Sequence, residues 1–221
     1  MILAIDTATR WLGLALHDGK AIITEEGWRS VNTQTIDLAP AVATILARSG
    51  ITAANLKAIA IAIGPGSYTG LRVGLGLAKG MALAYQTPLI GIPTLDIVAA
   101  SFCELPGDLI VTAEAGRTRI LVGRFQWTKR YGWQTDERPE LTTWDALLDA
   151  QQSEATFAGE ITEEAGKAIR NSGKPFTLAP PAACVRRAGY LAELGWRHWR
   201  KKKIDNPAAL VPDYLREPAG A

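Results

Sequence analysis

The sequence predicts an α/β fold built from two similar subdomains, each a mixed sheet flanked by helices. Three observations favour this class. Short apolar runs near the start, separated by turn residues, are typical of an antiparallel meander. Residues 57–102 then alternate strand, helix, strand and helix, an order that implies parallel pairing. The second half repeats this order in weaker form.

Composition excludes several classes of protein. The chain has 221 residues, 48% of them hydrophobic, and a net charge of +2 that demands neither a membrane nor a nucleic acid as partner. No apolar run is long enough to cross a bilayer, and Met1–Asp6 enters a strand-like segment without a charged leader. Cys103 and Cys184 are isolated, which argues against a disulfide framework or a zinc site. We expect a reduced, cytoplasmic protein without membrane contact.

The first elements follow from apolar patterning. Ile2–Ile5, Trp11–Leu16 and Ala21–Trp28 are expected to be strands. Asn32 is predicted to cap a helix that ends at Gly50. Pro40, inside that helix, should bend or interrupt it, because proline has no N–H and its ring clashes with the preceding turn.

A buried strand, a glycine-rich loop and a helix come next. Lys57–Ile63 is dense in Ile and Ala and predicts the strand, and a helix from about Leu71 to Tyr85 follows the loop. Leu89–Ile92 is a further short strand, and Thr94 should cap a helix that ends near Phe102.

The second half has the same kinds of element. Its expected strands are Leu109–Ala113, Arg119–Trp127 and Ala155–Gly159, and its expected helices are Trp144–Ala150, Ile161–Asn171 and Ala183–Lys203. Leu105-Pro106-Gly107 breaks the pattern and predicts a boundary. We therefore expect subdomains 1–104 and 105–221, with the last residues packing back on the first subdomain.

The loop Gly64–Gly70 lies where phosphate-binding loops often lie, between a strand and a helix. It matches neither the Walker A pattern nor GxGxxG, so a tight turn with glycines at positive φ is the competing interpretation. Asp6 ends the first strand, where a carboxylate can orient a metal-bound water or accept hydrogen bonds from turn amides. If a nucleotide binds at a partner interface, its candidate contacts are Asp6, Thr7, Gly64, Gly66 and Ser67.

The helix after the loop contains Gly74, Gly76 and Gly80. Each glycine inside a helix costs about 1 kcal/mol relative to alanine, so a tertiary contact should compensate. Gly76 and Gly80 are four residues apart and share one face, which Ala84 extends. Close packing within the fold and a subunit interface both explain this pattern.

No catalytic or metal-binding residue can be assigned. His17 and His198 are far apart in sequence, and Ser67 directly follows Gly66 instead of standing inside a GxSxG elbow. The last helix interleaves Trp196 and Trp199 with basic residues, namely Arg186, Arg187, Arg197, Arg200 and Lys201–Lys203. This pattern suits RNA contact, but cations at a helix C-terminus are also stabilised by the helix dipole, and we favour that simpler interpretation.

Several strings carry a family resemblance. Ile5-Asp-Thr-Ala-Thr9, Gly13-Leu-Ala-Leu16 and Gly64-Pro-Gly-Ser-Tyr-Thr-Gly-Leu-Arg72 resemble the TsaB (YeaZ) family, and Pro212-Asp-Tyr-Leu-Arg216 is similar to its C-terminal signature. The resemblance implies the actin-like, sugar-kinase and Hsp70 (ASKHA) fold. The sequence departs from the family at Asn32, at Glu114-Ala-Gly-Arg117 and at Leu121, and its second subdomain is therefore divergent.

The resemblance also implies a function. TsaB-like proteins act in the synthesis of threonylcarbamoyladenosine at position 37 of tRNAs that read codons beginning with A. The catalytic paralogue TsaD transfers the group and binds the metal, and the ATPase TsaE joins the assembly. We therefore expect ATP or ADP and metal to be held by partner subunits, tRNA to be bound only through the complex, and a homodimer when the chain is alone.

Pairing in this family uses the helix after the glycine-rich loop and the long helix before it. The implied interface residues are Ile36, Leu71, Arg72, Val73, Gly74, Gly76, Leu77, Gly80 and Met81. The alternative is a stand-alone ASKHA-type ATPase or small-molecule kinase that uses Asp6 and the loop. Such enzymes need further phosphate motifs, and residues 105–221 contain no second glycine-rich loop, which favours a non-catalytic scaffold.

Overall fold

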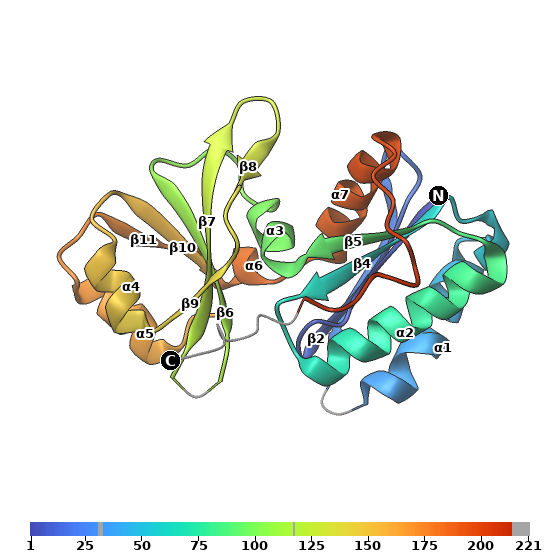
Figure 1. Cartoon of the computed structure of the whole chain (residues 1–221), viewed down its shortest axis with the longest axis horizontal. Coiled ribbons are helices and arrows are strands. Elements are labelled where there is room, and N and C mark those ends of the chain that lie inside the picture. Colours follow the sequence, from blue (N-terminus) through green and yellow to red (C-terminus); the bar gives the residue numbers. More distant parts are fainter. Residues whose placement is uncertain (31–32, 117, 214–221) are drawn as a thin grey trace. The chain divides into compact units, whose positions relative to one another are not determined.

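The computed structural model describes residues 1–30, 33–116 and 118–213. The described residues divide into two compact units, one comprising Met1–Ile97 together with residues 186–213, the other Val98–Val185. Each unit is a mixed sheet flanked by helices, which confirms the predicted fold class (Figure 1).

The first unit contains a five-stranded sheet in the order β3-β2-β1-β4-β5. Its strands are β1 (Ile2–Asp6), β2 (Trp11–His17), β3 (Ile22–Arg29), β4 (Ala58–Gly64) and β5 (Leu89–Pro93). The first three form the expected antiparallel meander, whereas β4 and β5 run parallel to β1. The carboxyl ends of β1, β4 and β5 therefore lie along one edge of the sheet.

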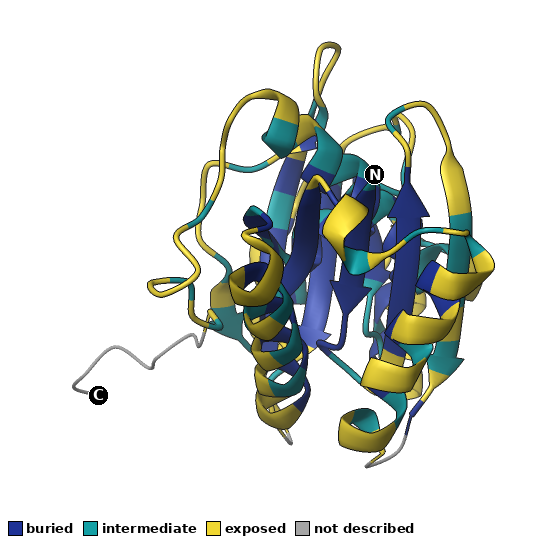
Figure 2. Cartoon of the chain, turned by 90° about the vertical axis from the view of Figure 1, so that its right-hand side faces the viewer, coloured by how far each residue is buried: buried dark blue, intermediate teal, exposed yellow. Residues whose placement is uncertain are grey.

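Helices α1 (Gln34–Arg48) and α2 (Tyr68–Tyr85) cover one face of this sheet, and α7 (Ala188–Arg200) covers the other (Figure 1). Figure 2 shows the strands buried between helices whose outer sides are exposed. Side chains alternate between the two faces along each strand. Leu3 and Ile5 of β1 pack toward α1 and α2, whereas Ile2 and Ala4 pack toward α7.

The second unit repeats the same topology. Its strands are β6 (Asp108–Glu114), β7 (Ile120–Thr128), β8 (Gly132–Gln134), β9 (Glu140–Thr142), β10 (Ala155–Gly159) and β11 (Phe176–Leu178). They form the order β11-β10-β6-β7-β8, with β9 also paired to β7. As in the first unit, an antiparallel β6–β7 pair precedes two strands that run parallel to β6. This repetition is the arrangement expected of an ASKHA fold.

Short helices complete the chain. They are α3 (Thr94–Ala99), α4 (Trp144–Ala150), α5 (Glu163–Asn171), α6 (Pro181–Cys184) and the 3-10 turn Ala53–Asn55. Among the described residues, no helix combines the length and the apolar character needed to cross a membrane.

Pro40 was expected to bend or interrupt its helix, and α1 continues past it without interruption. Two expectations about the later part of the chain differ from the structure. The single helix predicted over Ala183–Lys203 is divided into α6 and α7, because Val185 and Arg187 have extended backbone angles. The chain from Arg186 onwards groups with the first unit, whereas 105–221 was expected to form one subdomain. The physical reason is that α7 packs on the alanine-rich face of the first sheet.

Three short strands were not predicted from the sequence, and some of the predicted features lie outside the described residues. Strands β8, β9 and β11 have three residues each, which is too short to show an alternation of apolar and polar residues. Asn32, expected as a helix cap, Arg117, and residues 214–216 of the C-terminal signature lie outside the described residues.

Candidate functional site

The outer surface of α1 and α2 exposes apolar side chains. Ile36 of α1 is 71% exposed, and on α2 Tyr68 is 56% and Leu83 84% exposed. Leu83 comes seven residues after Gly76 and three after Gly80, so the three share one helix face. We call the surface formed by Ile36, Tyr68, Gly76, Gly80 and Leu83 the docking face.

The two glycines of this face have no neighbour inside the described part of the subunit. A Cβ atom built on Gly76 or Gly80 would meet nothing within 4 Å. Of the two explanations for the glycines, close packing within the subunit is therefore not observed for this pair. The face is open at their positions, so a neighbouring backbone has room to approach closely.

The nine expected interface residues divide into three groups. The first group is exposed and consists of Ile36, Arg72, Gly76 and Gly80. The Arg72 guanidinium carbon lies 3.8 Å from the centroid of the Tyr68 ring. Val73, Leu77 and Met81 are half-buried and pack on the core beneath α1 and α2. They border the docking face.

Leu71 and Gly74 face inward, which corrects their expected place at an interface. Leu71 is 1% exposed and packs among residues of the sheet. A Cβ on Gly74 would lie 2.1 Å from Thr7 Oγ1, so this glycine permits α2 to approach the end of β1. The difference follows from helix geometry, because position 74 is about 200° around the helix from position 76.

Sequence reasoning did not single out Tyr68 or Leu83, although helical spacing from Gly76 and Gly80 was a sufficient signal for Leu83. Tyr68 was missed for another reason. It was placed in the loop, whereas α2 begins at Tyr68, with the Ser67 hydroxyl accepting a hydrogen bond from Gly70 N as its N-cap.

The glycine-rich loop is held against the end of β1. Ser67 N donates to Ala8 O at 2.6 Å, and Thr7 Oγ1 donates to Gly70 O at 2.7 Å. A Cβ on Gly66 would lie 2.2 Å from Ala8 O, so glycine is required for this close approach. The backbone groups of Ala8 and Gly70 used here are thus satisfied by the chain itself.

The C-terminal segment reaches the same loop. Asp205 N donates to Leu89 O at 2.9 Å, and Asp213 N donates to Ile63 O at 2.7 Å. Asp213 O would lie 2.9 Å from a Cβ on Gly64, whose φ is +116°. The residues before the C-terminus therefore lie along β5 and over the start of the loop.

Asp6 is engaged by a cation from its own chain. Its side chain is 1% exposed and that of Arg186 is 6% exposed, and Arg186 Nε donates to Asp6 Oδ2 at 2.9 Å. Asp6 Oδ1 accepts from Ala8 N at 2.9 Å, and the Arg186 guanidinium also contacts Thr9 Oγ1. Both carboxylate oxygens thus have a partner from the chain itself.

The break between α6 and α7 positions Arg186. From the sequence this residue belonged to a solvated basic helix, and nothing in its local pattern signalled burial. Extended angles at Val185 and Arg187 turn the backbone, so that Arg186 reaches Asp6 on a strand 180 residues away in sequence.

The two histidines have different surroundings. His17 is buried and its Nε2 lies 3.1 Å from Glu193 Oε2, while His198 lies in the last turn of α7. In the ranges 1–30, 33–116 and 118–213, no three His, Cys, Asp or Glu side chains gather in a metal-binding arrangement.

Comparisons with known proteins agree on one group. A family model described as TsaD, tRNA N6-adenosine threonylcarbamoyltransferase, matches residues 33–138. The tRNA threonylcarbamoyladenosine biosynthesis protein TsaB of Bacillus subtilis is 30% identical over 97% of this chain and 93% of its own length. TsaB of Escherichia coli is 34% identical over 74% of this chain and 64% of its own length. The solved structure of YeaZ from Pseudomonas aeruginosa superposes on this chain with a TM-score of 0.79. The two are 22% identical, and the match covers 97% of this chain and 99% of that one.

Proposed function

This chain belongs to the TsaB family of tRNA threonylcarbamoyladenosine biosynthesis proteins, and from that membership we propose that it is a non-catalytic subunit that pairs with TsaD. In this role it supports threonylcarbamoylation of adenosine 37 in tRNAs that read codons beginning with A. TsaE joins the assembly, and the partner subunits hold the metal and the nucleotide. When alone, the chain pairs with a second copy of itself.

One observation carries the proposal: the docking face is apolar and is open at its two glycines. Ile36 and Leu83 expose large apolar side chains, and a Cβ on Gly76 or Gly80 would meet nothing within 4 Å in the described subunit. Burial of apolar area stabilises association by about 25 cal/mol per Å², and glycines let two helices approach closely. Paired helices of a partner fit such a surface, giving a four-helix bundle with α1 and α2.

The surroundings of Asp6 support the scaffold over the kinase or ATPase. Asp6 Oδ2 accepts from Arg186 Nε and Asp6 Oδ1 accepts from Ala8 N. The buried guanidinium of Arg186 beside the carboxylate would repel a metal cation at this position. Removing Arg186 from Asp6 would leave a buried charge without a partner, at a cost of about 3–5 kcal/mol.

The test combines association with turnover. The purified chain is mixed with TsaD from the same organism, with and without ATP, and complex formation is followed by gel filtration and threonylcarbamoyladenosine formation on tRNA. We expect a complex with TsaD and dependence of product formation on this chain. The chain alone should hydrolyse ATP no faster than background. ATP turnover by the chain alone that is lost in a folded Asp6→Asn variant would instead support the kinase-like enzyme.

A further inference from the structure

The C-terminal end of α7 and the lysines that follow it form a basic surface with a residue from another element. Lys57, which precedes β4, places its Nζ 5.9 Å from the ring centroid of Trp196 and 5.4 Å from that of Trp199. The two indole rings are themselves 5.0 Å apart. We call this surface the basic cap; its cationic residues are Lys57, Arg197, Arg200, Lys201, Lys202 and Lys203.

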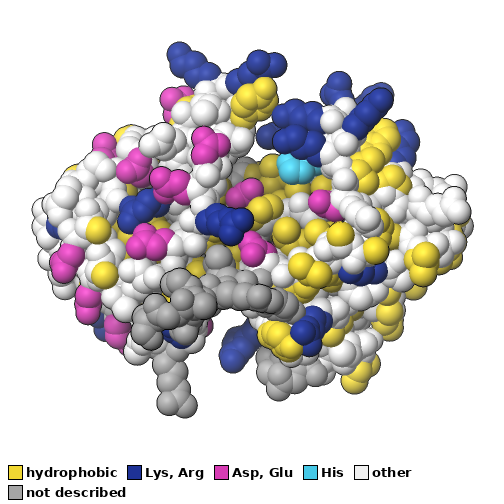
Figure 3. Space-filling model, in the orientation of Figure 1, with side chains coloured by type: hydrophobic (Ala, Val, Ile, Leu, Met, Phe, Trp, Pro, Cys, Tyr) yellow, Lys and Arg dark blue, Asp and Glu magenta, His cyan; other side chains and the backbone are white. Residues whose placement is uncertain are grey.

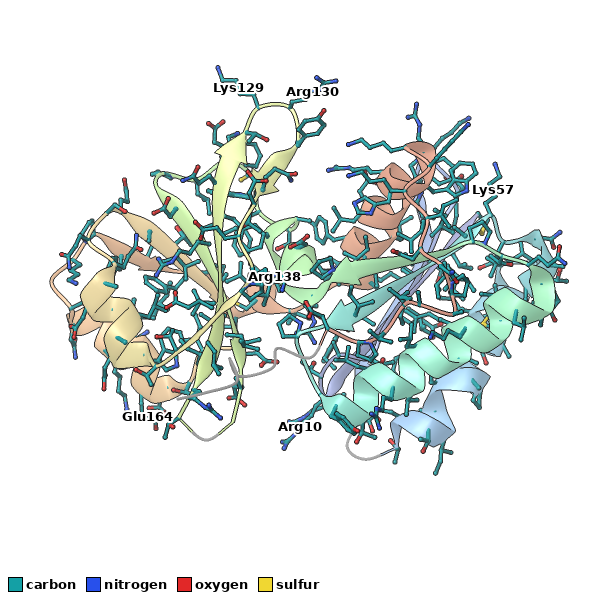
Figure 4. The ribbon with its side chains drawn as sticks, in the orientation of Figure 1. Arg10, Lys57, Lys129, Arg130, Arg138 and Glu164 are labelled. Atoms are coloured by element: carbon teal, nitrogen blue, oxygen red, sulfur yellow. The ribbon has the colours of Figure 1, made fainter. Side chains whose placement is uncertain are left out.

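Figure 3 shows Lys and Arg side chains crowded over this end of α7, and Figure 4 shows Lys57 beside the same helix. The cap therefore involves a tertiary contact between residues 57 and 196–199. The helix dipole explains cations in the last turn of a helix, but it does not explain Lys57, which lies on no helix.

Three acidic side chains near the cap, those of Glu193, Asp205 and Asp18, have identified partners. Glu193 contacts His17 at 3.1 Å and Arg197 at 3.3 Å. The Asp205 carboxylate accepts a hydrogen bond from Gly91 N at 2.8 Å, and Asp18 accepts from Lys20 N and Ala21 N. These three carboxylates keep their negative charges, but they are fewer than the six cationic residues of the cap, so the cap keeps an excess of positive charge.

The lysines of the cap contribute to the pKa shifts of two neighbouring groups. Burial, and then the charges of Lys203 and Lys201, lower the pKa of His198 below its ordinary value. Burial, and then the charge of Lys57, lower the pKa of the Met1 amino group. Burial is the largest cause of both pKa shifts; the lysines of the cap act in the same direction, against the smaller opposing effects of Asp205 on His198 and of Asp18 on the Met1 amino group.

Trp196 and Trp199 are partly buried and support Lys57, so the cap presents mainly its cationic groups to solvent. Such a positive surface fits a polyanion, because lysines attract phosphates as point charges. We propose that the basic cap contacts the sugar–phosphate backbone of tRNA when the chain is part of the threonylcarbamoylation complex. This inference rests on the proposed function, and it replaces the helix-end interpretation that the sequence alone favoured.

The experiment uses the assembled complex with TsaD and TsaE. The cap variant carries Lys57→Gln, Lys202→Gln and Lys203→Gln, which removes three exposed charges from the cap. A matched control carries Lys129→Gln, Arg130→Gln and Lys167→Gln, which removes three exposed charges from the β7–β8 hairpin and from α5. Binding of unmodified tRNA is measured by fluorescence anisotropy over a range of salt concentrations.

Each lost phosphate contact lowers the slope of log K against log salt by about 0.7–0.9. We expect the cap variant to lose about two units of slope and to bind tRNA at least about 10-fold more weakly near 0.15 M salt, while the control binds like the parent. The melting temperature and the capture of TsaD should be unchanged in both variants. If the triple variant has a lower melting temperature than the parent, the single Lys202→Gln variant is measured instead, and the slope of log K against log salt should fall by up to about 0.9.

Several results would overturn the proposal. Unchanged tRNA affinity and slope in an assembled cap variant would do so while leaving the scaffold role intact. An equal loss in the control would assign the effect to net charge alone. Binding of the cap to vesicles of anionic phospholipid, with tRNA binding unaltered, would assign the surface to a membrane. Failure of the unmodified chain to assemble with TsaD would overturn the proposed function and, with it, this inference.

Discussion

At the scale of single residues, the environment of a side chain sets the chemistry open to it. The sequence allowed Asp6 two roles, metal orientation or satisfaction of turn amides. The structure gives it an amide partner in Ala8 and a buried cation in Arg186. The second partner could not be predicted, because it depends on a tertiary contact between segments 180 residues apart.

Arg186→Met should destabilise the first unit. The substitution keeps most of the side-chain volume but leaves the Asp6 carboxylate buried without its cation, so the free energy of unfolding should fall by about 3–5 kcal/mol. Urea unfolding followed by circular dichroism measures this. The double variant Asp6→Asn/Arg186→Met, which removes both charges, should recover much of the loss. If Arg186→Met alone leaves the unfolding midpoint unchanged, the ion pair contributes nothing to stability.

Asp96 predicts a pH dependence. Burial raises its pKa from 3.8 to about 6. Since the folded state holds the proton more tightly than the unfolded state, stability falls as pH rises from about 4 through 6, by at most about 3 kcal/mol. Asp96→Asn should therefore be more stable than the parent at pH 7.5, with the difference vanishing near pH 4. A difference that is constant between pH 4 and pH 7.5 would contradict this assignment.

At the scale of elements, periodicity predicted most of the strands and helices because their apolar faces are long enough to show a period. The boundaries of α4 and β10 agree with the sequence prediction, and α5 begins two residues later than expected. The division of the last helix was missed because its cause lies in the turn that brings Arg186 to Asp6. The contrast between Gly74 and Gly76 was missed for a similar reason, since spacing does not say which face meets the sheet.

Glycines on α2 and α7 should respond oppositely to the same substitution. A Cβ on Gly80 meets nothing, so Gly80→Ala should stabilise the isolated subunit by up to about 1 kcal/mol through helix propensity. A Cβ on Gly195 would lie 2.5 Å from Ala60 Cβ, so Gly195→Ala should destabilise by about 1–3 kcal/mol despite the same gain in propensity. Thermal unfolding of the two variants distinguishes them. Equal shifts of the same sign would contradict the close packing of α7 on the sheet.

At the scale of the whole molecule, the fold class was predictable because two halves of the chain repeat one order of strands and helices. The membership of α7 in the first unit was not, since the helix returns from the end of the chain to the face opposite α1 and α2. The candidate site was predictable only in part. Glycine spacing indicated the outward surface of α2, whereas Leu83 and Tyr68 became evident only with their exposure.

The central claim is that the docking face binds TsaD, and Gly80→Leu tests it most directly. The leucine enters open space in the isolated subunit but occupies the position that a partner backbone would approach. The measurement is the dissociation constant for TsaD by isothermal titration, together with the melting temperature of the variant alone. Lys167→Leu, at an exposed position of α5, is the control for an added apolar side chain.

Gly80→Leu should melt at an unchanged or higher temperature and bind TsaD about 5- to 150-fold more weakly, since overpacking of an interface costs about 1–3 kcal/mol. The Lys167→Leu control should bind TsaD like the parent. Parental affinity in a well-folded Gly80→Leu variant would contradict the account and remove this face of α2 from the interface.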